Sequence, residues 1–583
     1  MNHYYIGLSV TYHDPALAIL DQQGQVLFAE ATERYLQHKR ALHCAADPLH
    51  YVHELLRAYC PAPTAITLAI NWRKARPWYE KTVGTLGFLS AEGLLQTGIK
   101  KLQAPLENYQ LHHMMASQRT RITDAGINLV RIIREYYPQC QIHFRDYDHH
   151  LTHAAMACYS SPFEQAACAV IDSYGEHGAM AFFRYQQGSL QLLYEAKGLR
   201  MSSLGLLYMK LTELCGFNWL QGEEWKVMGL AAYGVLEPEL YALLEDLVQI
   251  DGFNCKHPAK TFSAALKQLE RFHYQPDQPI LAMANVAYTG QLFFAEKMSQ
   301  LLRRLQEVTQ LEQLTLAGGC ALNSVFNGQI KTRTGFKQVH IPSAPADDGC
   351  ALGAACLAWR DDHSNAAKPA TLLTPYLGAT IGHASLERFI RYNRALKVRH
   401  EPERVTQLTA QLLAEGKLIG WIQGRAEYGP RALGNRSILA DPRFAETQDA
   451  INQTIKCREQ FRPFAPAVLH EFGDVFFEDY QESPYMDKTL VIKAQQRAKI
   501  AAVCHVDGTG RLQTVKQAWN PRFYELIQHF YALTEIPILL NTSFNVMGKP
   551  LVHSLEDALA VFLTSGLDVL VVNDYIISKP DHG

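Results

Sequence analysis

The sequence predicts an α/β protein of two domains, in which short apolar strands alternate with helices and end in glycine-containing turns. Three observations indicate this class. The chain opens with three closely spaced apolar strands, and a later strand runs into a helix through Gly318-Gly319. A segment rich in glycine and arginine, 423–443, begins where the apolar run E-G-K-L-I-G-W-I ends. Because α/β proteins carry binding groups in loops at strand ends, these turns are candidate sites.

Length and composition limit the class of protein. A chain of 583 residues holds roughly two to four domains, and 48% hydrophobic residues suffice for full cores. Lys and Arg (55) nearly balance Asp and Glu (57), whereas a nucleic-acid surface is expected to carry a basic excess. No apolar run approaches the roughly 20 residues of a membrane span, and the N-terminus lacks the basic region of a signal peptide. Twelve cysteines without a Cys-x-x-Cys pair favour neither a zinc ribbon nor a disulfide framework. We therefore expect a cytoplasmic protein with no nucleic-acid or membrane partner.

The first elements are strands at 4–9, 16–20 and 26–29, separated by a turn and a hairpin. This order resembles the opening of the superfamily that holds sugar kinases, heat-shock chaperone ATPases and actin, whose first hairpin approaches the nucleotide phosphates. His13 and Asp14 occupy the first turn, where a purely structural role would more usually fall to Gly or Asn. Residues 48–140 then read mostly as helix.

The clearest metal signal is D-H-H-L-T-H-A-A, in which His149 and His153 are spaced to share one face of a helix. A predicted strand then delivers Asp172 at its carboxyl end, and Asp347-Asp348 precede a glycine-containing helix start. Two imidazoles with one or two carboxylates form a mixed nitrogen and oxygen site suited to Fe²⁺, Mn²⁺ or Zn²⁺. Which of the two consecutive aspartates meets the metal stays open.

Two glycine-containing turns indicate anion or nucleotide binding. Gly318 and Gly319 let the backbone come close to a ligand, and the helix that follows favours an anion or a nucleotide edge at its N-terminus. The segment 423–443 holds four arginines, whose planar forks match phosphate or carboxylate oxygens. The alternative is a surface loop of paired arginines, but Gly429-Pro430 and Gly434 fix turns that such a loop would not need. We interpret the segment as a phosphate-handling site. Its arginines are Arg425, Arg431, Arg436 and Arg443.

A polar stretch at 361–374 predicts a linker, so we expect domains at 1–360 and 375–583. In the second domain, the runs 452–466, 505–515 and 536–545 each place Arg, Lys, Ser or Asn at a turn beside a strand.

In combination, these motifs resemble the O-carbamoyltransferases typified by the nodulation protein U family, which includes the enzymes that carbamoylate tobramycin and cephamycins. The shared motifs run along nearly the whole chain: H-D, H-H-L-T-H-A-A, K-V-M-G-L-A-A-Y-G, G-x-A-L-G-A-A, E-Y-G-P-R-A-L-G-N-R-S-I-L-A-D-P-R, F-R-P-F-A-P and L-L-N-T-S-F-N. The resemblance implies an N-terminal actin-like domain of the Kae-like branch of the ASKHA superfamily and a C-terminal YrdC-like α/β domain.

The resemblance also implies an enzyme with two reactions. The YrdC-like domain would make carbamoyl-adenylate from carbamoyl phosphate and ATP. In the Kae-like domain, an acceptor hydroxyl of a small specialised metabolite would attack the carbamoyl carbon, and AMP would leave. The implied cofactors are ATP and a divalent metal, Fe²⁺ first, with Mn²⁺ or Mg²⁺ as alternatives. A homodimer is a further expectation.

Matching motif to motif assigns the residues. His13 would act on the acceptor hydroxyl, and the nucleotide loop would comprise Gly318, Gly319 and Asn323. The implied metal ligands are His149, His153, Asp172 and Asp348, and the carbamoyl phosphate and ATP contacts are Arg431, Lys456, Arg462, Arg511 and Ser543.

Two other functions remain open at this point. A threonylcarbamoyl transferase that modifies tRNA would share both folds, although the near-neutral charge argues against it. A nucleotide-gated binding module would lack turnover, against which the full set of catalytic and binding residues argues. The acceptor alcohol is not indicated by the sequence.

Overall fold

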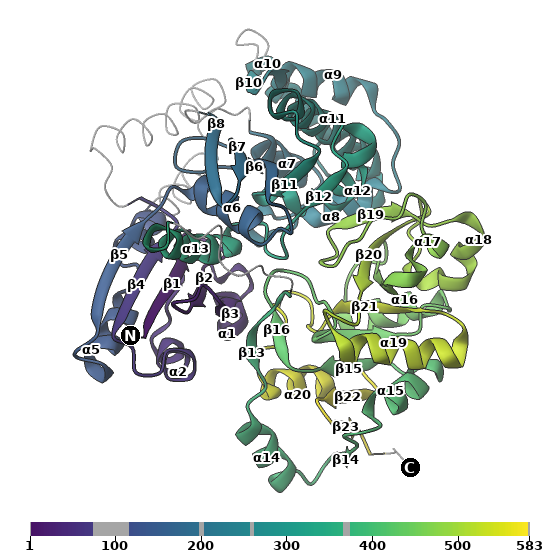
Figure 1. Cartoon of the computed structure of the whole chain (residues 1–583). Helices are drawn as coiled ribbons and strands as arrows, with labels where there is room; N and C mark the ends of the chain where they lie inside the picture. Colours follow the sequence, from purple (N-terminus) through teal and green to yellow (C-terminus); the bar gives the residue numbers. More distant parts are fainter. Residues whose placement is uncertain (1, 74–115, 197–202, 257–261, 365–373, 581–583) are drawn as a thin grey trace. The chain divides into compact units, whose positions relative to one another are not determined.

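The computed structural model describes residues 2–73, 116–196, 203–256, 262–364 and 374–580 (Figure 1). They form two compact units. Unit 1 comprises Met1–Glu33, Arg40–Leu322 and Ile330–Leu373, and unit 2 comprises Arg34–Lys39, Asn323–Gln329 and Thr374–Gly583. The main division therefore falls at the end of the predicted linker. The first two residues of that predicted linker, Asp361 and Asp362, are helical, because they complete the last turn of helix α13 (Cys350–Asp362).

Unit 1 contains two five-stranded sheets with the same internal order. In the first sheet, the opening strand pairs antiparallel with the second and parallel with the fourth. In the second sheet, β6 likewise pairs antiparallel with β7 and parallel with β11. This repeated order is the arrangement expected of an actin-like domain, and that prediction is confirmed. The sheets are β3(Val26–Ala31)-β2(Ala16–Leu20)-β1(His3–Ser9)-β4(Ala65–Ile70)-β5(Gln141–Asp146) and β12(Gln338–His340)-β11(Gln313–Ala317)-β6(Gln165–Ile171)-β7(Met180–Gln186)-β8(Ser189–Glu195).

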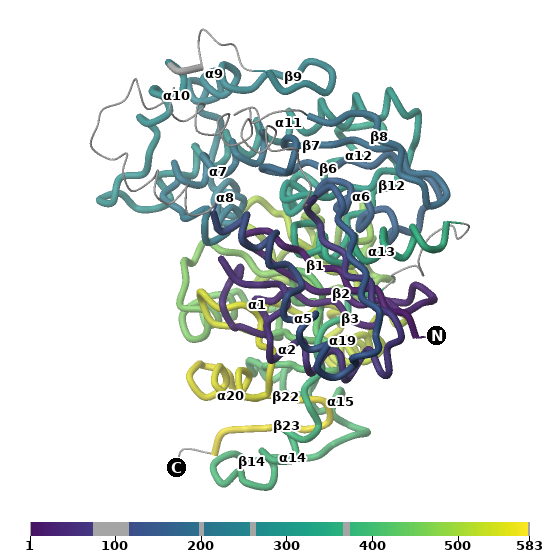
Figure 2. Tube along the Cα trace, turned by 90° about the vertical axis from the view of Figure 1, so that its left-hand side faces the viewer, coloured from purple at the N-terminus to yellow at the C-terminus, as the bar shows by residue number. Residues whose placement is uncertain are grey.

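Two helices position the loops of unit 1. Helix α13 lies on β1 and β2 of the first sheet and also packs against α6 (His149–Tyr159), which in turn covers β6 and β11 (Figure 1, Figure 2). Glycines permit this close approach. A Cβ atom on Gly7 would lie 1.8 Å from the carbonyl oxygen of Ala351, and one on Gly353 would lie 2.0 Å from that of Thr152. The starts of α6 and α13 are thereby held near the strand ends.

The other elements of unit 1 surround these layers. The prediction that 48–140 is mostly helical is wrong for β4, whose residues A-I-T-L-A-I are buried between two parallel partners. Most of 72–118 lies outside the described residues. The remaining elements, some of which extend into unit 2, are α1(Thr32–Leu36), η1(Lys39–Ala41), α2(Leu49–Tyr59), α5(Ile127–Tyr136), α7(Leu204–Leu214), η2(Trp219–Gln221), α8(Glu224–Ala231), α9(Pro238–Leu247), β9(Gln249–Asp251), β10(Asn254–Lys256), α10(Phe262–Leu269), η3(Glu270–Phe272), η4(Ile280–Met283), α11(Ala284–Thr309), η5(Gly319–Leu322), α12(Ser324–Arg333) and η6(Asp347–Gly349).

Unit 2 is an α/β unit built on a nine-stranded mixed sheet, in accord with the predicted class. Trp421 and Phe544 belong to its buried apolar core. The sheet order is β14(Lys397–His400)-β23(Tyr575–Ser578)-β22(Val569–Val572)-β15(Ile419–Ile422)-β17(Arg436–Ala440)-β21(Ile538–Ser543)-β18(Ala465–Leu469)-β20(Thr509–Val515)-β19(Lys488–Val491), and β13(Tyr376–Thr380) pairs with β16(Arg425–Glu427).

Helices of unit 2 flank this sheet, and α15 packs against α19. In the part of the chain that the structure describes, no helix combines the length and apolar character needed to cross a membrane. The helices are α14(His383–Tyr392), α15(Val405–Ala414), α16(Glu446–Ile451), η7(Asn452–Lys456), η8(His470–Phe472), α17(Gly473–Phe476), α18(Ala494–Arg497), η9(Ala498–Val503), α19(Pro521–Thr534) and α20(Leu555–Thr564).

Candidate functional site

Unit 1 brings two histidines and two aspartates together, which we call the imidazole–carboxylate cluster: His149, His153, Asp172 and Asp347. The histidines lie one turn apart on α6, while Asp172 follows β6 and Asp347 opens η6. The Nε2 atoms of both imidazoles lie 3.4–3.7 Å from Oδ2 of Asp172 and Oδ1 of Asp347. All four side chains are buried.

The cluster fits a divalent metal. Nε2 of His149, Nε2 of His153 and Oδ2 of Asp172 are buried and have no hydrogen-bond partner, which is costly unless a ligand satisfies them. Donors bonded at roughly 2.0–2.2 Å around a tetrahedral ion lie about 3.3–3.6 Å from one another, close to the spacing found here. Nitrogen and oxygen donors of this kind suit Fe²⁺, Mn²⁺ or Zn²⁺.

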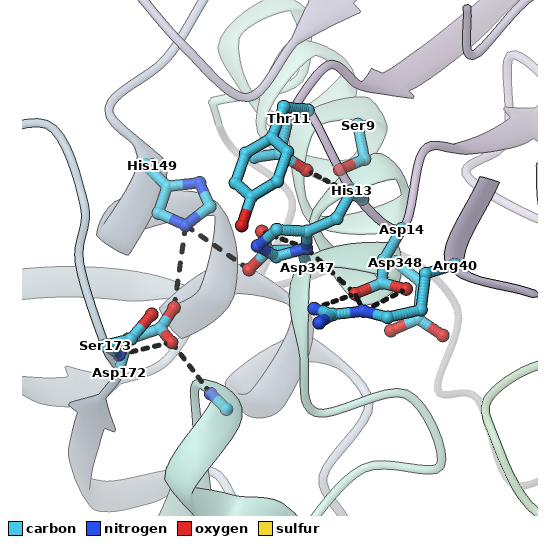
Figure 3. Close-up of polar contacts among 12 residues, drawn as sticks. Ser9, Thr11, His13, Asp14, Arg40, His149, Asp172, Ser173, Asp347 and Asp348 are labelled. Atoms are coloured by element: carbon cyan, nitrogen blue, oxygen red, sulfur yellow. Dashed lines mark hydrogen bonds and ion pairs between the residues drawn. The ribbon is translucent and has the colours of Figure 1, made fainter. Parts of the chain in front are cut away.

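Backbone donors hold the Asp172 carboxylate in place (Figure 3). Its Oδ1 accepts hydrogen bonds from the N–H groups of Ser173 at 2.7 Å and Gly319 at 3.2 Å, so that Oδ2 turns to the imidazoles. Gly318 has φ +90°, and a Cβ atom there would lie 2.3 Å from the carbonyl oxygen of Ile171. The Gly-Gly turn therefore supports the cluster directly, a role that the sequence did not suggest.

The aspartate that joins the cluster is Asp347, whereas matching motifs had assigned Asp348. Successive side chains of the short helix η6 point in different directions, so only one of the two can face the imidazoles. Oδ1 of Asp348 instead accepts a hydrogen bond from the N–H of Gly349 at 3.1 Å. Burial and the negative charges of Asp14, Glu33 and Asp347 raise the pKa of Asp348 to about 7.

The cluster balances its own charges. Burial alone would lower the pKa values of His149 and His153, but Cys350 and the carboxylates of Asp172 and Asp347 raise them well above the ordinary value. Burial opposes ionisation of Asp347, yet the imidazoles hold its pKa well below the usual range. Cys350 also lies within ligand distance of both imidazoles. Cys350 stands outside any Cys-x-x-Cys pair, so the sequence did not indicate that it would lie beside the imidazoles.

His13 lies beside the cluster. Its Nδ1 is 2.8 Å from Oδ2 of Asp14 and 3.6 Å from Oδ2 of Asp347. Asp347 therefore faces the two imidazoles of α6 through Oδ1 and His13 through Oδ2. Figure 3 shows Asp347 between His149 and His13. Nε2 of His13 has no hydrogen-bond or ion-pair partner among the described residues.

Asn323, the third residue of the predicted nucleotide loop, belongs to unit 2. It is buried, and its Oδ1 accepts a hydrogen bond from the N–H of Phe326 at 3.0 Å, which caps helix α12. Within unit 1, Gly319 contacts the metal cluster through its N–H group, which donates to Asp172.

Unit 2 concentrates cations, which we call the cationic cluster: Arg431, Lys456, Arg458, Arg462 and Arg511. Burial lowers the pKa of Arg511 well below the ordinary value, and the charges of three other arginines lower it further. Burial, together with Arg462, lowers the pKa of Arg458 to about 8. Burial and two neighbouring arginines likewise lower the pKa of Lys456. These side chains repel one another, as expected of a site that an anion completes.

The members of the cationic cluster differ in their partners. Nζ of Lys456 donates to the backbone and side-chain oxygens of Ser543 and Asn545, and Nε of Arg458 donates to Oδ1 of Asn452 at 2.6 Å. Nη1 of Arg462 lies 3.5 Å from Oε2 of Glu459. Arg431 and Arg511 have no hydrogen-bond or ion-pair partner within the described ranges. The five predicted contacts thus lie in one unit, and Arg458 joins them.

Local backbone structure presents these cations. Arg511 lies on β20, and Lys456 ends the π-helical turn η7, after which Cys457 has φ 45° in the left-handed region. Single π-helical turns occur frequently at functional sites. Arg458 could have been found from its place in the run K-C-R-E-Q-F-R-P, between Lys456 and Arg462.

Of the four arginines of 423–443, interpreted from the sequence as a phosphate-handling site, three have partners within the protein. Arg436 is fully buried and donates to backbone carbonyls, including those of Gln423 and Ala379. Arg425 donates to the carbonyl oxygens of Leu377 and Gly378, and Arg443 pairs with Asp441. Arg425 and Arg436 hold the loop together through backbone carbonyl oxygens, and Arg443 does so through a carboxylate, since all of these groups accept hydrogen bonds from a guanidinium. The Arg431 side chain has no such partner among the described residues.

The family models described as carbamoyltransferase N-terminus and carbamoyltransferase C-terminus match residues 111–356 and 410–579. An uncharacterised protein of Synechocystis sp. is 32% identical over 99% of this chain and 97% of its own length. Nodulation protein NolNO of Sinorhizobium fredii is 37% identical over 74% of this chain and 63% of its own length. The 3'-hydroxymethylcephem-O-carbamoyltransferase of Amycolatopsis lactamdurans is 30% identical over 60% of this chain and 64% of its own length.

Among solved structures, that of T. kodakarensis HypF aligns with 64% of this chain and 50% of its own, at 12% identity and a TM-score of 0.32. A score this low supports no inference about function.

Proposed function

Because this chain belongs to the carbamoyltransferase family and is a transferase, we propose that it is an ATP-dependent O-carbamoyltransferase acting on an alcohol of a small metabolite. The observation that carries the proposal is the cationic cluster, which lies inside the region matched by the C-terminal family model. Carbamoyl phosphate and ATP are both anions. A site that brings them together must offset their repulsion, and a group of half-buried, mutually repelling cations does so.

In the proposed first reaction, carbamoyl phosphate and water yield carbamate and phosphate, and a carbamate oxygen attacks the α-phosphorus of ATP. The bond to the β-phosphate breaks, and carbamoyl-adenylate and pyrophosphate are formed. Arg431 and Arg511 would hold phosphate oxygens through their planar forks, while Lys456 and Ser543 would orient the carbamoyl end. Arg462 and Arg458 would neutralise charge that develops on the leaving group.

In the proposed second reaction, the acceptor hydroxyl oxygen attacks the carbamoyl carbon, the carbon–oxygen bond to AMP breaks, and AMP leaves. Nε2 of His13 would take the hydroxyl proton, a contribution worth roughly 10²–10⁴-fold in rate. This role is supported because Nε2 of His13 has no hydrogen-bond or ion-pair partner among the described residues. Gly318 and Gly319 would lie next to the nucleotide.

His149, His153, Asp172 and Asp347 would hold a divalent metal. When bound, it would supply a positive charge that orients phosphate or carbonyl oxygen and stabilises the negative charge formed there. Asp347 would link that site to His13 through its second oxygen. The metal's identity, the cytoplasmic location and the homodimer stay predictions.

The test measures ATP consumption by purified protein with and without carbamoyl phosphate. We expect AMP, phosphate and pyrophosphate only when both substrates are present. Incubation with a panel of hydroxylated metabolites should then yield a product whose mass has increased by one carbamoyl group. ATP consumption that is independent of carbamoyl phosphate would contradict the proposal, and so would nucleotide binding without turnover in the presence of all substrates.

A further inference from the structure

An ion pair in unit 1 lies behind His13. The guanidinium of Arg40 donates to the carboxylate of Asp14 through NH2 at 2.8 Å and Nε at 3.2 Å, both to Oδ2. That same Oδ2 is 2.8 Å from Nδ1 of His13. The three side chains thus form a chain that begins at Arg40 and ends at the imidazole ring (Figure 3). The neighbouring Asp172 and Ser173 do not take part in it.

The backbone at and near Asp14 and Arg40 is strained. Asp14 has φ 52°, Arg40 has φ 60°, and Ala41 and His43 have φ 41° and 61°, all in the left-handed region that non-glycine residues rarely adopt. Two backbone hydrogen bonds join the loops, from the N–H of Asp14 to the carbonyl of Arg40 and from the N–H of His43 to the carbonyl of Tyr12. Such strain persists only where the surroundings require it, and it gathers at functional sites.

Arg40 is itself fixed from the far side. Its NH1 donates to the carbonyl oxygens of Trp219 at 3.2 Å and Leu220 at 3.3 Å, and its backbone N–H donates to the carboxylate of Glu33 at 2.8 Å. Its side chain is only 17% exposed. A guanidinium held at both ends cannot swing away, so the Asp14 carboxylate that it binds is also fixed.

We propose that Asp14 and Arg40 are a positioning pair that fixes the ring orientation and the tautomer of His13, an inference that rests on the proposed function of His13. An ionised carboxylate only accepts hydrogen bonds, so the nitrogen that faces Asp14 must carry the ring proton. In a neutral imidazole the other nitrogen then has a free lone pair. In the neutral ring, Nε2 is thereby the unprotonated atom, as a base for the acceptor hydroxyl requires.

The charges support this arrangement. Burial would raise the pKa of Asp14, but the charge of Arg40 and the hydrogen bonds from His13 and Arg40 lower it to about 2, so the carboxylate stays ionised. Asp347 places a second carboxylate oxygen 3.6 Å from the same Nδ1. Both carboxylates therefore favour the proton on Nδ1.

The first test uses Asp14→Asn. The asparagine side chain has nearly the same size, but its amide N–H would donate to Nδ1 and move the ring proton to Nε2. Long-range ¹H–¹⁵N correlation on ¹⁵N-histidine-labelled protein, loaded with diamagnetic Zn²⁺, reports the tautomer, and His13→Asn assigns the signals. We expect the Nδ1–H form in the parent and the Nε2–H form in Asp14→Asn. A parent ring with the proton on Nε2 would overturn the proposal, whatever reaction the protein catalyses.

The second test measures transfer from supplied carbamoyl-adenylate. Asp14→Asn should lower kcat by roughly 10²–10⁴-fold, because the wrong tautomer cannot take the proton, with KM for carbamoyl-adenylate changed by no more than about 3-fold. Arg40→Lys keeps the charge but loses the fork, and should lower kcat by roughly 10-fold. Arg271→Ala removes an exposed arginine paired with Glu239, and should leave kcat unchanged.

Rates for Asp14→Asn within a few-fold of the parent would contradict the pair's role. If the parent itself transfers nothing while its His13 shows the Nδ1–H form, the proposed function fails and the positioning geometry stands. A variant that loses its cooperative melting transition is replaced by Asp14→Glu, which keeps the acceptor but displaces it. We expect Asp14→Glu to retain the Nδ1–H tautomer and to recover part of the rate.

Discussion

The imidazole–carboxylate cluster of unit 1 is buried, the arginines of the cationic cluster of unit 2 are half-buried, and the two clusters treat charge in opposite ways. In unit 1, each imidazole lies within 3.7 Å of two carboxylate oxygens, and the groups stabilise one another's charged forms. In unit 2, burial and mutual repulsion lower the pKa values of Arg458 and Arg511. The charges of the first cluster nearly cancel, whereas the second cluster carries only positive charges.

The difference indicates what completes each site. The raised pKa values of His149 and His153 favour their protonated forms when no metal is bound, so metal binding releases protons. The second cluster gains free energy from a suitably sized anion. Without a ligand, ion pairs stabilise the first cluster in part, whereas repulsion between cations destabilises the second.

The largest expected effect comes from removing one imidazole of the first cluster. His149→Ala or His153→Ala should remove bound metal and abolish transfer, because the remaining donors form an incomplete shell. ATP and carbamoyl phosphate should still be consumed, since unit 2 is untouched. Metal analysis and a transfer assay on the same preparations check this. Unchanged metal content in both variants would show that these imidazoles are not ligands.

His13→Asn should lower transfer by roughly 10²–10⁴-fold, the contribution of a general base. Asparagine keeps a similar size and one hydrogen bond, so metal content and carbamoyl-adenylate formation should persist. The assay supplies carbamoyl-adenylate and follows the acceptor's gain in mass. A rate within a few-fold of the parent would exclude His13 as the base.

Arg431→Ala should lower carbamoyl-adenylate formation by roughly 10–150-fold, because the loss of a charge-assisted hydrogen bond costs about 1.5–3 kcal/mol. Transfer from supplied carbamoyl-adenylate should be restored to the parent rate. Arg443→Ala is the matched control for the same loop, since its partner is Asp441 rather than a ligand. Failure of the rescue would assign Arg431 to the scaffold.

The smallest expected effect is on the free energy of unfolding, which should change in opposite directions when a residue is replaced in each of the two clusters. Arg511→Met replaces a half-buried cation, which has no side-chain partner among the described residues, by an apolar chain of similar length and should stabilise the ligand-free protein by about 1 kcal/mol. His153→Ala should destabilise it, because two carboxylates lose a partner. Denaturant unfolding followed by fluorescence checks both.

Pyrophosphate supplies the control for that comparison. It should raise the melting temperature of the parent protein and have a smaller effect on Arg511→Met, whose site holds one cation fewer. A destabilised Arg511→Met protein would mean that Arg511 has a structural partner.

The sequence alone determined the elements and the residue types of both sites. The period of D-H-H-L-T-H-A-A placed His149 and His153 on one helix face, and a strand end delivered Asp172, because helical and strand periods are local properties. The ordered motifs also indicated the family, and through it the cations Lys456, Arg462 and Arg511. These features depend on near neighbours in the chain.

Tertiary structure alone decided which of several chemically equivalent side chains reach a site. Asp347 rather than Asp348 meets the imidazoles because of how η6 turns. Of the four arginines in 423–443, two donate to backbone carbonyls and a third pairs with Asp441. Asp14 and Arg40, far apart in the sequence, meet at His13. Adjacent or identical residues have the same local preferences, and only the packing of distant segments distinguishes the directions in which their side chains point.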